Sequence, residues 1–273
     1  MNYFNLNDKN IIITGGAGML GEKHVEAIIV AGGKPIVLDH SQKKLETLKQ
    51  KIEKKFSYDL LYFKVDITNE LQVKKILAKI KDLKIYINGI INNAAINPTS
   101  ENLKNFESRV EKFTLENWYK FLDVELTGTF LILKHFGSYM ASSNKGGVII
   151  NVSSDLGIIA PDQRLYNHSK KNKEFKEVKP ITYSVSKAGM IGFTKYISTY
   201  WSSKNIRCNA ICPGGIYTKD MNKNFLKKIN ELIPLGRMAR PDEYQGTIIW
   251  MLSEASSYLN GAIITVDGGR SVW

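Results

Sequence analysis

Tyr183 and Lys187 are the residues whose types and spacing first suggest chemistry, because the segment Tyr183-Ser-Val-Ser-Lys187 places them four residues apart. In a helix, residues at this spacing lie one turn apart on the same face. A phenol has an ordinary pKa of about 10, and a nearby cation favours the phenolate and lowers that value. The pair could therefore exchange a proton with a substrate hydroxyl or carbonyl near neutral pH. The same spacing also fits an ordinary amphipathic helix, so this motif alone does not establish a catalytic pair.

A glycine-rich turn follows the first predicted strand. The β-branched run Ile11–Ile13 suits a buried strand and leads directly into TGGAGMLG, residues 14–21. Within this turn the pattern G-x-G-x-x-G ends at Gly21, and such glycines permit a tight turn and close approach of the backbone to a pyrophosphate. A helix over 19–31 would point its N-terminal amides at those phosphates. The strand–turn–helix context favours a dinucleotide-binding site.

Asp39 ends a second predicted strand over 34–39. A carboxylate at this position binds the adenosine ribose hydroxyls and repels a 2′-phosphate. We therefore expect NAD as the cofactor, with NADP second, since Lys23 and His40 are nearby basic groups. The alternative role for Asp39 is to cap the next predicted helix, over 41–55.

Strands and helices alternate along the whole chain. Further strands are predicted over 60–66, 85–91, 147–152, 207–212 and 262–266, and further helices over 68–80, 114–141, 181–203, 218–229 and 241–252. This alternation predicts a single α/β domain over 1–273, a Rossmann fold with a doubly wound parallel sheet of about seven strands and helices on both faces. Polar segments over about 96–113 and 155–180 are predicted insertions on the substrate side.

Polar residues follow three of the predicted strands. Asp66 follows the third and could either cap the next helix or reach the adenine. The run NNAA, 92–95, follows the fourth strand, and Ser153-Ser154 follow the fifth. Cofactors bind outside the carboxyl ends of parallel strands, so we expect these side chains to line one site.

The insertion over 155–180 is long for a connection to the Tyr183 helix. Its middle, 169–176, is too charged to be core, so the insertion is either a substrate loop or a disordered segment. The run PDQRLY favours the substrate loop, because it offers mixed polar and aromatic groups. Its candidate substrate contacts are Gln163, Arg164 and Tyr166.

The composition limits the other function classes. The chain has 273 residues, 43% of them apolar, and a net charge of +12. The lysines are spread along predicted helices without a basic stripe or aromatic platforms, so we expect no nucleic-acid partner, whereas an anionic small substrate stays open. No apolar run approaches the roughly 18 residues of a membrane span, and the start lacks the order of a signal peptide. We expect a cytoplasmic protein. The spacings of the cysteines and histidines suggest no metal site.

Taken together, these motifs resemble the short-chain dehydrogenases/reductases over essentially the whole chain. The shared segments, in order, are TGGAGMLG, VDIT, NNAA, NVSS, YSVSK, NAICPGGIYT, LGRMARPDE and VDGG. The resemblance implies an NAD(P)-dependent enzyme that interconverts a hydroxyl and a carbonyl by hydride transfer. It also implies a homotetramer assembled through the helices over 114–141 and 181–203.

The resemblance assigns roles to individual residues. Tyr183 would be the catalytic acid/base, Lys187 would lower its pKa and bind the nicotinamide ribose, and Ser154 would hydrogen-bond the substrate oxygen. Ser154 is preferred to Ser153 because the family's serine lies three residues before a glycine, here Gly157. The cofactor contacts that it implies are Gly15, Gly18, Met19, Leu20, Gly21, Asp39, Asp66, Ile67, Asn93, Ala94, Tyr183, Lys187, Pro213, Gly214, Ile216 and Thr218.

Three features depart from the family pattern. Met19 stands where a glycine is common, and Ser154 and Tyr183 are farther apart than usual because of the insertion. Glu125 replaces the usual asparagine, which supports a water-linked proton relay to the lysine. A glutamate there could accept a hydrogen bond and pair with Lys187, and we include it among the catalytic candidates. It would also add a negative charge near a phenol that should ionise.

The insertion and the C-terminal DGGRSVW are similar to a bacterial subgroup that accompanies flagellin modification and surface-sugar biosynthesis. That similarity implies a sugar or nucleotide-sugar substrate. The alternative is a generic ketone or 3-oxoacyl-thioester reductase. A more remote alternative is a non-catalytic dinucleotide-binding subunit, to which only Glu125 points.

Overall fold

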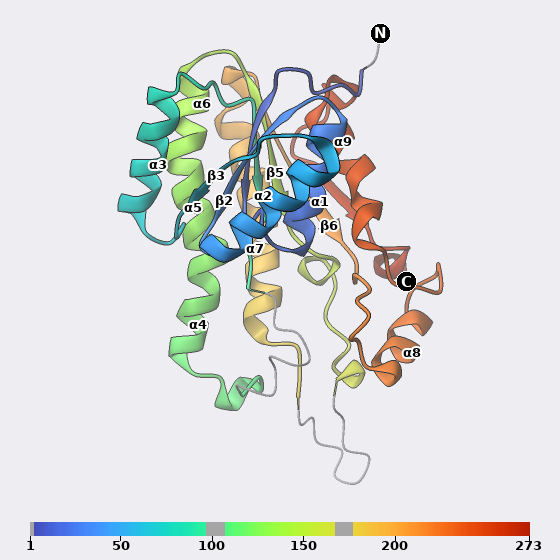
Figure 1. The fold of residues 1–273 in the computed structure, drawn as a ribbon. Helices are drawn as coiled ribbons and strands as arrows, with labels where there is room; N and C mark the ends of the chain where they lie inside the picture. Colours follow the sequence, from blue (N-terminus) through green and yellow to red (C-terminus); the bar gives the residue numbers. More distant parts are fainter. Residues whose placement is uncertain (1–2, 97–106, 167–176) are drawn as a thin grey trace.

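A parallel sheet runs through the centre of the computed structural model, which describes residues 3–96, 107–166 and 177–273 (Figure 1). Its strand order is β3-β2-β1-β4-β5-β6-β7, so the predicted Rossmann sheet is confirmed. The strands are β1 (Asn10–Thr14), β2 (Lys34–Asp39), β3 (Leu61–Lys64), β4 (Gly89–Asn92), β5 (Gly147–Val152), β6 (Ile206–Pro213) and β7 (Ile263–Val266).

The strand order reverses direction between β1 and β4. Residues Ile11–Ile13 of β1 pair with β2 on one side and with Gly89–Ile91 of β4 on the other. Because β1 is central and covered on both faces, its side chains form the continuous β-branched run seen in the sequence. Ligands bind at such a reversal point in open α/β sheets, at the carboxyl ends of the strands.

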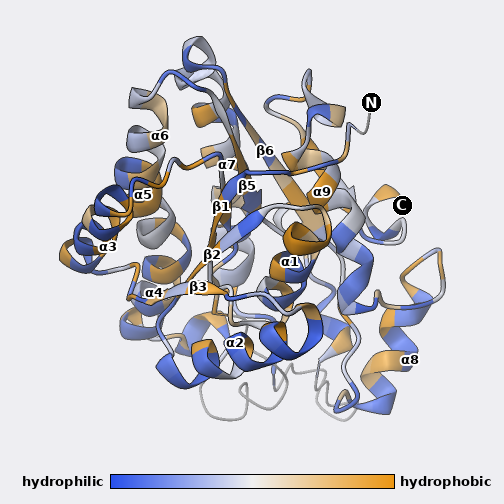
Figure 2. Ribbon diagram, turned by 45° about the horizontal axis from the view of Figure 1, so that its top comes forward, coloured by the Kyte–Doolittle hydropathy of each residue, from blue (hydrophilic) through white to orange (hydrophobic). Residues whose placement is uncertain are grey.

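Helices cover both faces of the sheet, as expected. One buried apolar cluster joins the sheet to α1 (Met19–Val30), α2 (Gln42–Phe56) and α9 (Gln245–Leu252). The cluster on the other face joins it to α3 (Glu70–Asp82), the helix within 115–142 and α7 (Ile181–Tyr200). Along α2, the hydrophobic stretches turn toward the sheet and the hydrophilic ones turn outward (Figure 2).

The helix predicted over 114–141 is present but is not uniform. It consists of α4 (Leu115–Leu122), α5 (Gly128–Ile132) and α6 (Ser138–Ser142), joined by the π-helical turns η3 (Asp123–Thr127) and η4 (Leu133–Gly137). Such turns occur often at functional sites, and η3 carries the buried Glu125. Gly128 packs closely against Ile67, which follows β3, because a Cβ there would lie 2.6 Å from the Ile67 side chain.

Two predicted helix starts are wrong. The helix expected from residue 218 is α8 (Lys223–Glu231), because the Asn222 side chain caps it by accepting hydrogen bonds from two backbone amides. The helix expected from residue 68 begins at Glu70, with Asn69 as its cap. Asp66 instead accepts hydrogen bonds from Thr68, so the capping alternative for Asp66 is also wrong.

Short 3₁₀ turns complete the described chain. They are η2 (Val110–Lys112), η5 (Asp155–Gly157), η6 (Gln163–Leu165), η7 (Ser202–Lys204), η8 (Pro241–Tyr244), η9 (Glu254–Ser256) and η10 (Arg270–Val272). Both predicted insertions extend beyond the described residues: 97–106 lies outside them, as does 167–176 with its charged middle.

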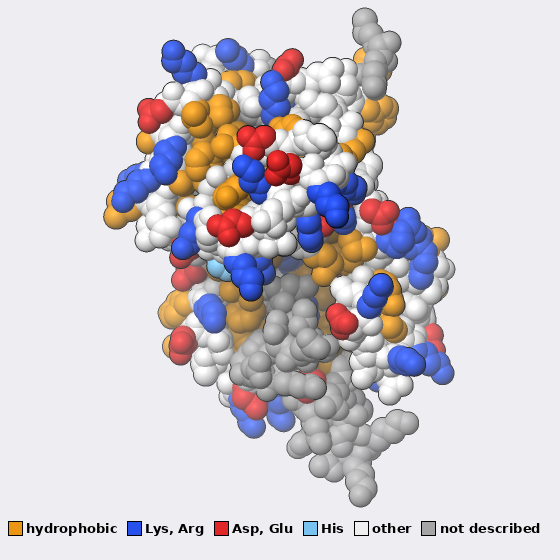
Figure 3. Space-filling view, viewed as in Figure 1, with side chains coloured by type: hydrophobic (Ala, Val, Ile, Leu, Met, Phe, Trp, Pro, Cys, Tyr) orange, Lys and Arg blue, Asp and Glu red, His pale blue; other side chains and the backbone are white. Residues whose placement is uncertain are grey.

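The surface carries charges of both signs. On the face shown in Figure 3, basic side chains are interspersed with acidic ones and do not gather in one stripe. Among the described residues, none of the helices combines the length and the apolar character needed to cross a membrane.

Candidate active site

The glycine-rich turn after β1 is shaped by close backbone contacts. Gly15 has a φ of +61°, and a Cβ there would lie 2.8 Å from the Cα of Ala94. A Cβ on Gly21 would lie 2.3 Å from the carbonyl oxygen of Gly15. Only glycine fits these two positions without a backbone shift. The turn therefore lies against Ala94, which follows β4, and against the first turn of α1, which follows Gly18.

Hydrogen bonds join the ends of β1 and β4. The Thr14 hydroxyl oxygen accepts from the amides of Asn93, at 3.0 Å, and Ala94, at 3.1 Å. The Asn93 side chain donates back to the carbonyls of Thr14, at 3.0 Å, and Gly15, at 3.1 Å. Thr14 is a site residue that the sequence analysis did not single out, although it opens the TGGAGMLG motif.

Asp39 lies beside the same turn and is buried. Its carboxylate accepts hydrogen bonds from the amides of Ala17, at 3.2 Å, and Ser41, at 3.0 Å. The cap of α2 is Ser41, whose side chain accepts from Lys44, so the helix-cap alternative for Asp39 is wrong. A buried carboxylate next to the glycine-rich turn fits the expected ribose contact.

The other predicted cofactor residues lie at the carboxyl ends of further strands. Asp66 is exposed and Ile67 is buried after β3, whereas Met19 is exposed and Leu20 half-buried at the start of α1. Pro213 ends β6, and the amide of Gly214 donates to Val266 at 2.9 Å. Ile216 pairs with Ala239 in an isolated bridge, and Thr218 is half-buried. The chain thus supplies a continuous edge to which a dinucleotide could bind.

Tyr183 and Lys187 lie one turn apart on α7, as predicted. The Lys187 ammonium lies 5.7 Å from the centre of the Tyr183 ring and donates to the carbonyl of Val152 at 3.2 Å. It also forms an ion pair with Glu125 at 3.0 Å, which confirms the pairing expected for that glutamate. Both charged side chains are buried, with 6% and 2% of their area exposed.

The expected lowering of the Tyr183 pKa is wrong in this structure. Burial raises the pKa of the Tyr183 phenol above its usual value, and the negative charges of Glu125 and Asp155 raise it further. The hydrogen bond with Ser154 and the positive charge of Arg270 act in the opposite direction. The pairing of Lys187 with Glu125 places a negative charge beside the cation that was predicted to favour the phenolate.

The structure supports the choice of Ser154 over Ser153. The Ser153 hydroxyl donates to the backbone carbonyl of Lys187 at 2.7 Å and is occupied there. The Ser154 hydroxyl interacts with Tyr183 and donates to the Asp155 carboxylate at 2.8 Å. The Ser154 oxygen also accepts from the Leu156 amide at 3.2 Å, so the hydroxyl is held at the carboxyl end of β5 beside Tyr183.

A second buried ion pair supports Ser154 and was not predicted. Arg270 in the C-terminal turn η10 binds the second Asp155 oxygen at 2.7 Å, and the two side chains are 8% and 3% exposed. Asp155 was not singled out from the sequence, because polar residues commonly follow a strand. The available signals were its position next to Ser154 and the arginine in DGGRSVW.

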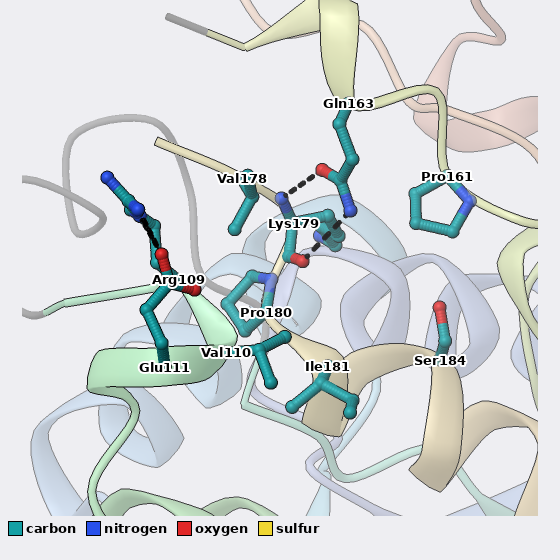
Figure 4. Close-up of a pocket in the computed structure, with 10 residues that line it drawn as sticks. All are labelled: Arg109, Val110, Glu111, Pro161, Gln163, Val178, Lys179, Pro180, Ile181 and Ser184. Atoms are coloured by element: carbon teal, nitrogen blue, oxygen red, sulfur yellow. Dashed lines mark hydrogen bonds and ion pairs between the residues drawn. The ribbon is translucent and has the colours of Figure 1, made fainter. Parts of the chain in front are cut away.

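A cavity of about 510 Å³ opens beside the first turn of α7 (Figure 4). The predicted substrate residue Gln163 lines it and accepts a hydrogen bond from the Lys179 amide at 2.8 Å. Arg164 is not among the lining residues and pairs with Asp162 in solvent. Tyr166 packs on the ring of Phe225, 5.9 Å between centres. The lining residues are Arg109, Val110, Glu111, Pro161, Gln163, Val178, Lys179, Pro180, Ile181 and Ser184.

Lys179 is a further site residue that the sequence did not reveal. Its ammonium lies 3.7 Å from the centre of the Tyr183 ring, closer than that of Lys187. Burial lowers the pKa of Lys179 to about 7. A lysine in a charged insertion gives no sequence signal for such a position.

Comparisons with known proteins agree with this geometry. The family profile described as "Enoyl-(Acyl carrier protein) reductase" matches residues 16–271. A 3-oxoacyl-[acyl-carrier-protein] reductase of Thermotoga maritima is 30% identical over 97% of this chain and 98% of its own length. An NAD-dependent glycerol dehydrogenase of Listeria innocua is 28% identical over 98% of this chain and 96% of its own length.

Solved structures show the same likeness. A short-chain dehydrogenase from Leptospira borgpetersenii, crystallised with bound NAD⁺, superposes with a TM-score of 0.81 at 29% identity, covering 99% of this chain and 96% of that one. The fold, the glycine-rich turn, the Ser154–Tyr183–Lys187 arrangement and these matches lead to one conclusion. The chain belongs to the short-chain dehydrogenases/reductases and is an NAD(P)-dependent oxidoreductase acting on hydroxyl or carbonyl groups.

Proposed function

We propose that the chain interconverts a hydroxyl and a carbonyl on a sugar or nucleotide-sugar, with NAD as the preferred cofactor. The observation that carries the proposal is the cavity beside α7, whose mainly apolar lining includes charged and polar residues of the two insertions, Arg109, Glu111 and Gln163 (Figure 4). A cavity of about 510 Å³ is in the range of sites that bind whole small molecules. The resemblance to the flagellin-modification subgroup further supports a sugar nucleotide used in surface-glycan synthesis.

The residues at the ends of β1, β2 and β4 would hold the dinucleotide. Gly15 and Gly18 would lie against the pyrophosphate, and Asp39 would bind the adenosine ribose. Asp66, Ile67 and Asn93 would contact the adenosine half, whereas Ile216 and Thr218 would hold the carboxamide. The bound nicotinamide supplies or accepts the hydride. The Asp39 carboxylate supports NAD over NADP, because a 2′-phosphate beside it would meet a negative charge.

Tyr183 would move the proton and Ser154 would hold the reacting oxygen. The Ser154 hydroxyl, which donates to Asp155 at 2.8 Å in this structure, would turn to donate to the substrate oxygen and leave the substrate's own proton for Tyr183. Tyr183 would take the proton of the substrate hydroxyl during oxidation and return it during reduction. Lys187, held between Glu125 and the Val152 carbonyl, would bind the nicotinamide ribose.

A generic 3-oxoacyl-thioester reductase is the second candidate. The name of the Thermotoga maritima relative favours it, since that protein is 30% identical to this chain. An acyl-carrier substrate has a long apolar arm, which most of the cavity lining would suit, but Arg109, Glu111 and Gln163 add charged and polar groups that such an arm would leave unpaired. We therefore rank it below the sugar substrate.

A substrate panel tests the proposal. Turnover with NAD(H) and NADP(H) would be measured on nucleotide-activated sugars, free sugar acids and polyols, with 3-oxoacyl thioesters as controls. NAD-linked turnover of a sugar-type compound is the expected result. Turnover of thioesters alone would replace the proposal with the second candidate.

We also propose that the protein is a cytoplasmic homotetramer assembled through α7 and the helix within 115–142. Large side chains on these helices are exposed in the single chain: Phe130 by 50%, Tyr196 by 63% and Tyr200 by 61%. An interface would bury such a surface. Light scattering should give four times the mass of the chain, and a monomer would contradict the proposal.

A further inference from the structure

Lys179 lies where the substrate, rather than the cofactor, is expected. We propose that Lys179 binds an anionic group of the substrate, a carboxylate or a phosphate, close to the carbon that reacts. This assignment rests on the proposed function, since it takes Tyr183 as the acid/base. The other residues of the site were identified from sequence motifs, whereas Lys179 comes from the insertion. The assignment also names the chemical class of the substrate, an anion.

The Gln163 side chain holds the backbone of Lys179 through two hydrogen bonds. The Lys179 amide donates to Gln163 at 2.8 Å, and the Lys179 carbonyl accepts from the same side chain at 3.5 Å (Figure 4). The next residue, Pro180, precedes the first turn of α7. The backbone is therefore held against the cavity while the ammonium lies 3.7 Å from the Tyr183 ring centre.

An ammonium over the face of the phenol leaves the hydroxyl at the ring edge free for the reacting oxygen. A substrate whose oxygen contacts that hydroxyl must place its neighbouring substituents over or beside the ring. A carboxylate or phosphate on such a substituent would come within reach of the Lys179 ammonium. Neutral polyols of the same length would lack this contact.

Two buried ion pairs also lie around Tyr183. Lys187 is 3.0 Å from Glu125, and Arg270 is 2.7 Å from Asp155. Tyr166 also lies close enough to interact with the phenol. Breaking either buried pair to bind a substrate anion would be costly, because it would leave a buried charge uncompensated. Lys179 lines the cavity beside α7, so an anion bound in that cavity would contact it without breaking either of these two pairs.

Binding of an anion at Lys179 should take up a proton. Burial, together with the positive charges of Lys187 and Arg270, lowers the pKa of Lys179 to about 7, whereas Glu125 and Asp155 act in the opposite direction. A bound anion would favour the charged form and raise that pKa. The affinity should therefore be greatest below pH 7 and should fall by about tenfold per pH unit above it.

Isothermal titration calorimetry on the NADH-loaded protein tests the proposal without any turnover. The probes share a six-carbon chain: D-gluconate carries a carboxylate, D-glucitol 6-phosphate carries a phosphate, and D-glucitol is neutral. At pH 7, in two buffers of different ionisation enthalpy, at least one anion should bind with uptake of about half a proton. D-glucitol should bind at least about tenfold more weakly and without proton uptake. The better anion identifies the group that the site takes.

Three variants make the assignment specific. Lys179→Met should lose the anion preference and the proton uptake, whereas Lys179→Arg should keep the affinity without proton uptake, because a guanidinium stays protonated. Lys228→Met is the matched control, since Lys228 donates to the Arg164 carbonyl at 2.8 Å beside the same insertion. It should behave as wild type. NADH binding monitored by fluorescence shows that each variant is folded.

Three results would overturn the assignment: unchanged anion binding in Lys179→Met, equal binding of gluconate and glucitol by the wild type, or binding of neither anion. Turnover of neutral sugars combined with any of them would leave the proposed function standing. Anion binding at Lys179 without turnover of any sugar-type compound would keep the Lys179 assignment and contradict the proposed function.

Discussion

The glycine-rich end and the catalytic pocket lie at the same edge of the sheet but are built differently. At the glycine-rich end, Thr14 and Asn93 form neutral hydrogen bonds to the backbone, and the glycines allow contacts that a Cβ would block. Around Tyr183, the principal contacts are between charged side chains, in the pairs Glu125–Lys187 and Asp155–Arg270.

The two regions are therefore stabilised by different kinds of interaction. The turn over residues 14–21 is limited by shape, so its response to substitution should depend on volume and backbone conformation. The catalytic pocket is a matter of buried charge, so its response should depend on which partner of a pair is lost. Variants can therefore test the contrast one region at a time.

The largest effect on stability is expected for Arg270→Met. The variant leaves Asp155 as a buried carboxylate without its cation, and removal of one partner of a buried pair costs about 3–5 kcal/mol. Urea unfolding measures the loss. Arg164→Met is the control, because Arg164 makes a solvent-exposed pair with Asp162 at the same distance, 2.7 Å, and such pairs contribute about 0–1 kcal/mol. Equal losses in both variants would remove the distinction between the pocket and the surface.

His24 on α1 is a titratable group at the glycine-rich end, where it should make stability depend on pH. Burial lowers the pKa of His24 from 6.5 to about 4, so the unfolded chain binds more protons between these values. Stability is then fully present above pH 6.5 and falls as the pH drops toward 4, by about 3 kcal/mol in total. Urea unfolding between pH 7 and pH 4 should show this slope, and His24→Asn should flatten it. An unchanged slope would place its cause elsewhere.

Glu125→Asn should change the pH dependence of catalysis. The negative charge of Glu125 raises the pKa of Tyr183, and its loss frees the charge of Lys187 to act on the phenol. The rise of kcat/KM with pH for alcohol oxidation should move to lower pH by about one unit. A profile at the wild-type position would show that the Glu125–Lys187 pair does not control the phenol.

The smallest effect is expected for Asp39→Ala. Loss of this carboxylate should relax the preference for NAD by about tenfold, because a 2′-phosphate no longer meets a negative charge. The ratio of kcat/KM with NAD and NADP measures the change. Asp66→Ala serves as the control, since Asp66 is exposed and follows a different strand. If the ratio stays at its wild-type value in Asp39→Ala, Asp39 does not contact the adenosine ribose.

The sequence predicted the sheet and the glycine-rich turn because those features are local. Buried strands read as β-branched runs, and the turn has a fixed spacing between Thr14 and Gly21. The alternation of strand and helix predicted a doubly wound parallel sheet, and the observed sheet confirms that prediction.

The buried ion pairs of the pocket could not be predicted in the same way, because the two residues of each pair lie far apart in the sequence. Asp155 meets Arg270 only after the C-terminal turn packs against η5, and Glu125 faces Lys187 from the π-helical turn η3. The prediction for the Tyr183 pKa failed for the same reason: it counted the local lysine but neither burial nor the distant carboxylates.

The most direct test of the catalytic assignment is Tyr183→Phe, measured for turnover and for NADH binding in the same preparation. The change removes the phenol proton and little else, so turnover should fall by at least about a thousandfold while the affinity for NADH stays within about twofold of wild type. Turnover near the wild-type rate with intact NADH binding would show that the acid/base is not Tyr183 and would contradict the assignment of this pocket.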